Sequence, residues 1–366
     1  MVSAISERGP KIDEIARLIG TYNETVRYWY KSLLHRGLAI QASCNYERLG
    51  MRRVIVIVEL GDAFKECADT VFSELGQVAY AISYAKTRDA ECYISSFSVP
   101  DDCIIQWADF MLQLKKIGFF SSMESISLDW VRNVPMQAGF FDFGTGKWRN
   151  DWRSKNANAV PVEVNRDQRQ RYDMMDLKII EQLQISANVS LAEVFAKTGA
   201  KNYNTFAWHY RAHILGRGLI RGYRINYTTL RFGPEHGNSG AQRRSYSWVD
   251  IVADGLSESE KSTLRIALAR VPFVWMEGSG PRSYYARIAC PASQLSNLLN
   301  FLKDAGTSSG RIRSFRLDPG HGLSFSLSNH FYDKDVQRWV FKKEEALQRF
   351  EALGRIRREL IRGRNQ

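Results

Sequence analysis

The chain has 366 residues, with 51 Lys and Arg against 39 Asp and Glu and a formal net charge of +12 at pH 7. Hydrophobic residues make up 44% of the sequence, enough for several domain cores, which excludes an intrinsically disordered chain. The apolar runs have the length of strands rather than membrane spans, and the first residues lack the layout of a secretion signal. Five irregularly spaced cysteines indicate reduced thiols, so we expect a cytoplasmic protein without a cofactor.

Charge is segregated along the sequence. Residues 54–132 contain 12 acidic and 6 basic side chains, whereas Lys and Arg are in excess on both sides of this block and again in residues 331–366. Such segregation favours particular surfaces that face a polyanion over a uniformly basic protein.

The sequence repeats itself once. Arg36-Gly37-Leu38 recurs as Arg217-Gly218-Leu219, and Asn45-Tyr46 recurs at the same spacing as Asn226-Tyr227. Matches before and after these occur in the same order, so we predict a duplicated unit of about 180 residues, which is too long for a solenoid repeat.

Each unit is predicted to begin with helices. In the second copy Ser190 and Glu193 form a capping box, Gly199 ends that helix, and a further helix spans about residues 202–215. A short turn between two such helices is typical of a helix-turn-helix. The first copy shows the same pattern from residue 12 to residue 34, with only a stub of helix before it.

A block of strands and helices follows in each unit, in the order β-α-β-β-α-β that is typical of a ferredoxin-like domain. The expected fold class is therefore α+β, with two tandem units, each a winged helix-turn-helix followed by a ferredoxin-like βαββαβ domain. The predicted segments are a winged helix-turn-helix at 1–48, a ferredoxin-like domain at 49–132, a linker at 133–171, a second winged helix-turn-helix at 172–232, a second ferredoxin-like domain at 233–330 and a basic amphipathic helix at 331–366.

This combination resembles the Lrp/AsnC family of transcription regulators. The local matches are residues 176–180 with Leu183 and Gln184, the segment 219–223, and residues 14–20 with the apolar positions after them. The resemblance implies a sequence-specific regulator that binds double-stranded DNA, and two units in one chain imply a covalent pseudodimer. It also implies a small-molecule effector and further homo-oligomers through the sheet domains or the C-terminal helix.

The family's effector pocket has a Thr-Gly-x-x-Asp turn between the second and third strands. The corresponding positions are Thr87 and Glu91 in the first copy and Ser279 and Gly280 in the second. The first copy lacks the glycine and the second lacks the acid, so effector binding of the family type is in question.

The outward faces of the third helices carry the side chains expected to contact DNA. Arg suits guanine, Asn suits adenine, and Lys suits phosphate. The candidates are Asn23, Arg27, Tyr28, Lys31, Asn202, Asn204, Trp208 and Arg211. The alternative is an ordinary solvated helix face, which the outward aromatic residues Tyr28 and Trp208 disfavour. Arg221 and Arg224 are further candidates as wing or phosphate contacts, and strand-edge charges are the equal alternative for these two.

Other chemistry leaves weaker signals. His209 and His213 stand four apart on a helix, but the sequence shows no third ligand, so we predict no metal site, no catalytic residues and no enzyme. The alternative functions are a tetrapyrrole-binding enzyme of siroheme-decarboxylase type, which this architecture also resembles, and a ligand-sensing or protein-interaction scaffold. The decarboxylase is expected to place His and Arg on inner strands, whereas residues 77–85 contain Tyr80 and Tyr84 but no His.

Overall fold

The computed structural model describes residues 1–149, 151–152, 168–229, 246–304 and 311–364. Part of the expected linker, residues 153–167, and the expected start of the second sheet domain, residues 233–245, lie outside them. The described residues include no helix that is both long and apolar enough to cross a membrane.

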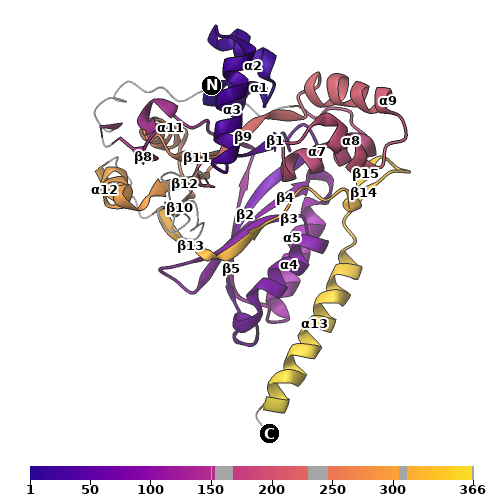
Figure 1. The fold of residues 1–366 in the computed structure, drawn as a ribbon. Coiled ribbons are helices and arrows are strands. Elements are labelled where there is room, and N and C mark those ends of the chain that lie inside the picture. Colours follow the sequence, from indigo (N-terminus) through magenta and orange to yellow (C-terminus); the bar gives the residue numbers. More distant parts are fainter. Residues whose placement is uncertain (150, 153–167, 230–245, 305–310, 365–366) are drawn as a thin grey trace.

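Two groups of short helices lie at one end of the molecule (Figure 1). Their members are α1 (Val2–Arg8), α2 (Ile12–Ile19) and α3 (Asn23–His35), and α7 (Met174–Ile185), α8 (Leu191–Thr198) and α9 (Tyr203–Trp208). Gly20 and Gly199 end α2 and α8 in the left-handed conformation, with φ of 68° and 69°, which glycine adopts without a steric penalty. Helix α9 continues directly into a π-helical segment, His209–Leu215.

The strands that follow the two helix groups pair with each other. β1 (Ala39–Cys44) and β9 (Ile220–Asn226) form an antiparallel two-stranded sheet in which Ala39 is opposite Asn226. The expected wings therefore join the two helix groups.

A nine-stranded sheet forms the centre of the molecule, in the order β5-β2-β4-β3-β13-β10-β12-β11-β6. Its strands are β2 (Met51–Leu60), β3 (Ala81–Thr87), β4 (Cys92–Pro100), β5 (Phe120–Leu128), β6 (Trp130–Asn133), β10 (Tyr246–Ala253), β11 (Val274–Ser279), β12 (Tyr284–Pro291) and β13 (Ile312–Ser324). The two outermost strands, β5 and β6, are joined by the single residue Asp129. Because of this connection, the two edges lie next to each other and the sheet curls around on itself.

Helices cover the outside of this sheet (Figure 1). They are α4 (Ala68–Val78), α5 (Ile104–Lys116), α11 (Glu258–Ala269) and α12 (Leu295–Asp304), with short 3-10 turns at Asp62–Cys67, Asp101–Cys103, Ala138–Phe140, Tyr227–Thr229, Ala292–Gln294 and Asn329–Phe331. Each half of the sheet thus follows the predicted order strand, helix, strand, strand, helix, strand, and the fold is α+β.

The segment that follows each half of the sheet packs on the other half. The hairpin of β7 (Phe141–Asp142) and β8 (Lys147–Trp148) packs on the second half, where the Trp148 indole donates a hydrogen bond to the Tyr246 hydroxyl at 3.1 Å. The hairpin of β14 (Tyr332–Asp333) and β15 (Arg338–Trp339) packs on the first half, where the Trp339 indole donates to the Leu49 carbonyl at 3.2 Å.

The C-terminal helix α13 (Lys343–Arg364) continues this exchange. Phe350 is fully buried against Phe110 and Phe119, and Arg357 donates to the Ala63 carbonyl at 2.8 Å. The helix therefore packs along α5 in the first half of the chain, rather than on the domain that directly precedes it (Figure 1).

Candidate functional site

A cavity of about 340 Å³ lies between the β1–β9 sheet and the nine-stranded sheet. Its wall is contributed by β1, β2, β3, β6, β9, β11, β12, the end of β13 and the end of α7. The polar, charged and aromatic side chains of the lining include Gln41, Tyr46, Glu47, Arg53, Asp129, Gln184, Arg224, Trp275 and Arg287. This volume lies within the range of about 300–1,000 Å³ that is usual for small-molecule binding sites.

Arg53 reaches this cavity from β2. Its Nη1 donates to the Ser96 hydroxyl at 3.1 Å, and its guanidinium carbon lies 4.6 Å from the centre of the Tyr46 ring. Its Nε is buried without a hydrogen-bond partner among the described residues. Burial lowers the pKa of Arg53, because the charged form loses its water.

Arg224 reaches the cavity from β9. Its Nη2 donates to Gln41, its guanidinium carbon lies 5.4 Å from the centre of the Trp275 ring, and its Nε has no partner in the part of the chain that the structure describes. Burial, together with the nearby Arg287 and Arg53, lowers the pKa of Arg224 to about 10. The group is therefore a cation at neutral pH that has been placed where the charge is unfavourable.

Arg287 differs from these two, because it has a carboxylate partner. Its Nε and Nη2 both donate to Asp250, each at 2.7 Å, and Asp250 lies directly opposite it on the neighbouring strand β10. Burial alone would lower the pKa of Arg287, but the charges and hydrogen bonds of Asp250 and Tyr285 together raise it. This bidentate pair fixes the third guanidinium in the wall.

The cavity has an excess of positive charge. Its carboxylates already have partners, since Glu47 pairs with Arg221 at 3.2 Å and Asp129 lies 3.8 Å from Arg52. Among the described residues no ion pair joins Arg53 or Arg224 to a carboxylate. The arrangement can therefore accept an anion, whose carboxylates would supply the partners that these two guanidinium groups lack.

A second cavity of about 350 Å³ adjoins the first. The two share Ser43, Asn133, Arg224 and Trp275 as lining residues. Arg224 and Trp275 therefore face both spaces, and a ligand larger than one cavity would meet these side chains near its middle.

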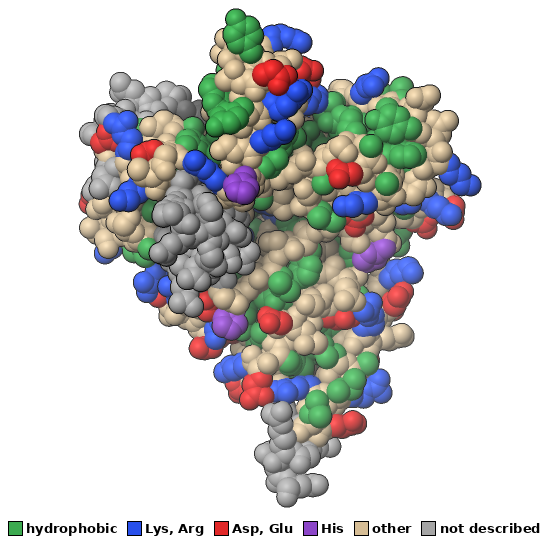
Figure 2. Space-filling view, in the orientation of Figure 1, with side chains coloured by type: hydrophobic (Ala, Val, Ile, Leu, Met, Phe, Trp, Pro, Cys, Tyr) green, Lys and Arg blue, Asp and Glu red, His purple; other side chains and the backbone are tan. Residues whose placement is uncertain are grey.

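The predicted DNA-contacting residues on the third helices lie on the outside of the molecule. Tyr28 and Trp208 are 73% and 55% exposed. Asn23 donates to Asp13 at 2.8 Å, and Arg27 pairs with Glu24 at 2.9 Å. Lys31, Asn204 and Arg211 are exposed, and the exposed residue Asn202 caps α9 by accepting from Asn204 and Thr205. Figure 2 shows hydrophobic side chains, with Lys and Arg between them, on the end of the molecule that these helices form.

Arg221 and Arg224 require a correction, because they do not face outward as wing contacts. Arg221 pairs with Glu47 and donates to the Val131 carbonyl at 2.6 Å, and Arg224 is partly buried and lines the cavity. The physical reason is the pairing of β1 with β9, which turns one face of these strands toward the nine-stranded sheet.

The predicted effector residues do not line either cavity. The Thr87 hydroxyl donates to the Ala90 carbonyl at 2.6 Å, and Glu91 is exposed and pairs with Lys86 at 3.4 Å. Ser279 is buried, and a side chain on Gly280 would meet the Ser127 carbonyl oxygen at 2.1 Å. Both turns lie where the two halves of the sheet meet, with Thr87 opposite Leu317 and Ser279 opposite Trp130.

Arginine residues within apolar strands are the sequence signal that could have predicted this cavity. Arg287 stands in the middle of a strand whose other residues are apolar, and Arg53 directly precedes the apolar run of residues 54–58 in another strand. A charged residue at the centre of a buried strand needs a partner or a ligand. The sequence analysis looked for His and Arg on residues 77–85 instead. In that segment the Tyr84 hydroxyl donates to Asp69 and the Tyr80 hydroxyl donates to the Val340 carbonyl.

Comparisons with known proteins gave matches only among solved structures. No protein-family model and no curated protein matches the chain. The siroheme decarboxylase NirDL matches 96% of this chain and 98% of its own, with 11% identity and a TM-score of 0.47. Its co-complex with an iron-uroporphyrin III analogue matches 94% and 93%, with 9% identity and a TM-score of 0.44. E. coli AsnC covers 35% of this chain and 86% of its own, with 12% identity and a TM-score of 0.28.

One prediction is corrected by these matches. The sequence led us to expect that the chain is not an enzyme, whereas two solved structures that match it over nearly its full length are those of a decarboxylase. Similarity at these TM-scores carries no argument about the reaction, so the chemistry of this chain has to be argued from its own cavity.

Proposed function

We propose that the chain is an enzyme that binds a polycarboxylate tetrapyrrole in the arginine-lined cavity and removes carboxyl groups from it. The observation that carries the proposal is the presence of two guanidinium groups, of the buried Arg53 and the partly buried Arg224, that face a cavity without a carboxylate partner among the described residues. This chemistry corresponds to the decarboxylase alternative rather than to a DNA-binding protein.

The cavity wall suits a flat ligand with carboxylates at its rim. Trp275 and Tyr46 supply aromatic surface, and the guanidinium groups lie beside these rings. Planar guanidinium groups bind carboxylates through paired hydrogen bonds and also stack on aromatic rings. The adjoining second cavity offers room for a macrocycle that extends past Arg224.

Tyr46 is the residue that we assign to proton transfer. Its hydroxyl accepts a hydrogen bond from Gln184 at 2.9 Å, and burial raises its pKa, which keeps the phenol protonated at neutral pH. When a side-chain carboxylate leaves as carbon dioxide, the electron pair of the broken carbon–carbon bond takes the phenol proton, and the resulting phenolate takes a proton from water.

The experiment is to incubate purified protein with iron-uroporphyrin III and analyse the pigment by mass spectrometry. We expect products that have lost carbon dioxide, with slower loss in Tyr46→Phe and unchanged binding in that variant. Intact pigment after incubation with wild-type protein that binds it would overturn the reaction and leave a binding protein. Absence of binding would overturn the whole proposal.

A second candidate function is favoured by the exposed aromatic residues on the third helices. We propose that Asn23, Arg27, Tyr28 and Lys31, with their counterparts near Trp208, contact double-stranded DNA as the two halves of a duplicated regulator. Fluorescence anisotropy with a random-sequence duplex at two salt concentrations tests it. Arg27→Ala with Lys31→Ala should weaken binding and reduce its salt dependence by about 0.9 log units per lost phosphate contact. Equal binding by wild type and variant would remove these residues from the interface.

A further inference from the structure

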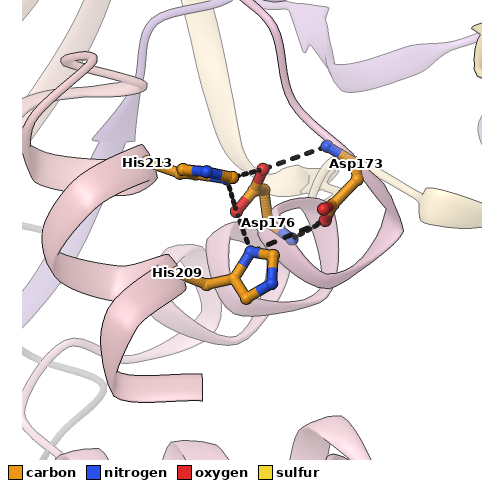
Figure 3. A group of neighbouring side chains, drawn as sticks. All are labelled: Asp173, Asp176, His209 and His213. Carbon is orange, nitrogen blue, oxygen red and sulfur yellow. Dashed lines mark hydrogen bonds and ion pairs between the residues drawn. The ribbon is translucent and has the colours of Figure 1, made fainter. Parts of the chain in front are cut away.

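A second cluster of polar side chains lies away from the arginine-lined cavity, between the start of α7 and the π-helical segment after α9. It consists of Asp173 and Asp176 from one side and His209 and His213 from the other (Figure 3). One potential ligand atom from each residue can be chosen so that all four lie within 4.8 Å of one another. Asp176 is fully buried, and both histidines are nearly so.

The imidazoles converge on one carboxylate. The Nδ1 atom of His209 lies 2.9 Å from Asp176 Oδ1, and that of His213 lies 2.9 Å from Asp176 Oδ2. Asp173 Oδ1 lies 3.7 Å from His209 Nδ1. Ligand atoms that share a zinc ion at about 2.0–2.2 Å are themselves about 3 to 3.5 Å apart, so the pairs at 2.9 and 3.7 Å are close to that spacing.

The backbone explains how two histidines of one helix reach the same carboxylate. Residues His209–Leu215 are π-helical, and the wider turn places residues four apart almost in line along the helix axis. The two imidazole rings consequently have centroids only 4.8 Å apart and both face α7 (Figure 3). Short π-helical segments are rare and are frequently found at functional sites.

The charges of the cluster also suit a dication. Two carboxylates meet two imidazoles, and none of the ion pairs described for Asp176 involves Lys or Arg. A divalent ion would neutralise the two carboxylates, and imidazole nitrogen with carboxylate oxygen is a donor set that zinc prefers.

We propose that Asp173, Asp176, His209 and His213 bind a zinc-type divalent cation that fastens α7 to the third helix of this group. Trp208 makes edge contacts with the same histidines, with ring centroids 5.1 Å from His209 and 4.5 Å from His213. The metal therefore also fixes the exposed indole on the outer face of the helix. This inference is independent of the function proposed for the arginine-lined cavity.

The test is metal binding by the full-length protein after treatment with a chelator. Titration with Co²⁺ should saturate at one ion per chain and give the strong visible absorption of a tetrahedral site, which Zn²⁺ should then remove. His213→Gln and His209→Gln should each abolish the absorption. His321→Gln is the matched control, because that histidine is exposed and its described ion pair is with Asp318, which is outside the cluster. This variant should bind Co²⁺ as wild type does.

A second measurement guards against variants that fail to fold. Zn²⁺ should raise the midpoint of thermal unfolding of wild type and His321→Gln, and should leave that of His213→Gln unchanged, with circular dichroism showing that each variant is folded. Failure of wild type to bind Co²⁺, or equal binding by His213→Gln, would overturn the proposal. In that case the two imidazoles simply donate hydrogen bonds to Asp176.

Discussion

The guanidinium carbon of Arg224 lies 5.4 Å from the centre of the Trp275 ring, and both side chains line both cavities. Arg224 comes from the two-stranded sheet that joins the helix groups, and Trp275 comes from the nine-stranded sheet. A cation on an indole ring is favourable, but it does not replace the water or the carboxylate that a buried guanidinium needs. This contact therefore marks the place where the fold holds a positive charge ready for a ligand.

Removal of one unpaired guanidinium should separate binding from stability. Arg224→Gln should weaken the binding of a polycarboxylate about tenfold to a hundredfold, because charge-assisted hydrogen bonds are lost. The same change should leave the free energy of unfolding within about 1 kcal/mol of wild type, because a desolvated charge is removed along with its contacts. Isothermal titration calorimetry and urea unfolding measure the two quantities. A large loss of stability with unchanged affinity would show that Arg224 has a structural role.

Arg287→Gln should give the opposite result and serves as the comparison for Arg224. This substitution leaves Asp250 buried without its bidentate partner. We expect the free energy of unfolding to fall by about 3–5 kcal/mol. Double substitution of Arg287 and Asp250 by residues of similar size should recover most of this loss. If Arg287→Gln has the same midpoint of urea unfolding as wild type, the pair of Arg287 and Asp250 does not stabilise the fold.

The buried thiols make stability dependent on alkaline pH. Burial raises the pKa of both Cys44 and Cys290 to about 12, above the ordinary value near 9. Between these two values the native protein keeps protons that the unfolded chain has released, so stability is lost as the pH rises through this window and is unaffected below it. Each thiol contributes up to about 1.4 kcal/mol per pH unit.

Urea unfolding at pH 8 and pH 10 checks this prediction. The decrease in the free energy of unfolding should be smaller in the variant with Cys44→Ala and Cys290→Ala than in wild type. Identical decreases in the two proteins would mean that these thiols do not carry the effect.

The C-terminal helix should stabilise the first half of the chain. Phe350 is fully buried against Phe110 and Phe119, so Phe350→Ala should lower the free energy of unfolding by about 3–5 kcal/mol. Ile356→Ala on the same helix is the control, because Ile356 is 57% exposed, and it should change stability by less than about 0.5 kcal/mol. Thermal and urea unfolding compare the two. Equal, small effects would contradict the packing of α13 on α5.

Much of the fold follows from local patterns in the sequence. The capping box of Ser190 and Glu193 and the glycine after it predicted α8, which the structure has at Leu191–Thr198. These features depend on residues near one another in the chain, which sequence periodicity records. The exchange of hairpins and the closing of the sheet through Asp129 depend instead on which distant surfaces fit together, and no local pattern records that.

The candidate site was harder to predict for the same reason. Arg53, Arg224 and Arg287 come from three strands that lie far apart in the sequence, and only the pairing of β1 with β9 brings Arg224 to the other two. The histidine cluster was half visible, since the spacing of His209 and His213 suggested part of a metal site. The missing ligands, Asp173 and Asp176, were not assigned from the sequence, and in the structure they also form the capping box of α7.

The most direct test of the central claim is a comparison of uroporphyrin III with its methyl ester, with binding followed through quenching of tryptophan fluorescence. The free acid should bind, the uncharged ester should bind far more weakly, and Arg53→Gln with Arg224→Gln should reduce the affinity for the acid to that for the ester. Equal binding of acid and ester, or affinity for the acid that survives both substitutions, would contradict the claim that the two guanidinium groups form an anion site.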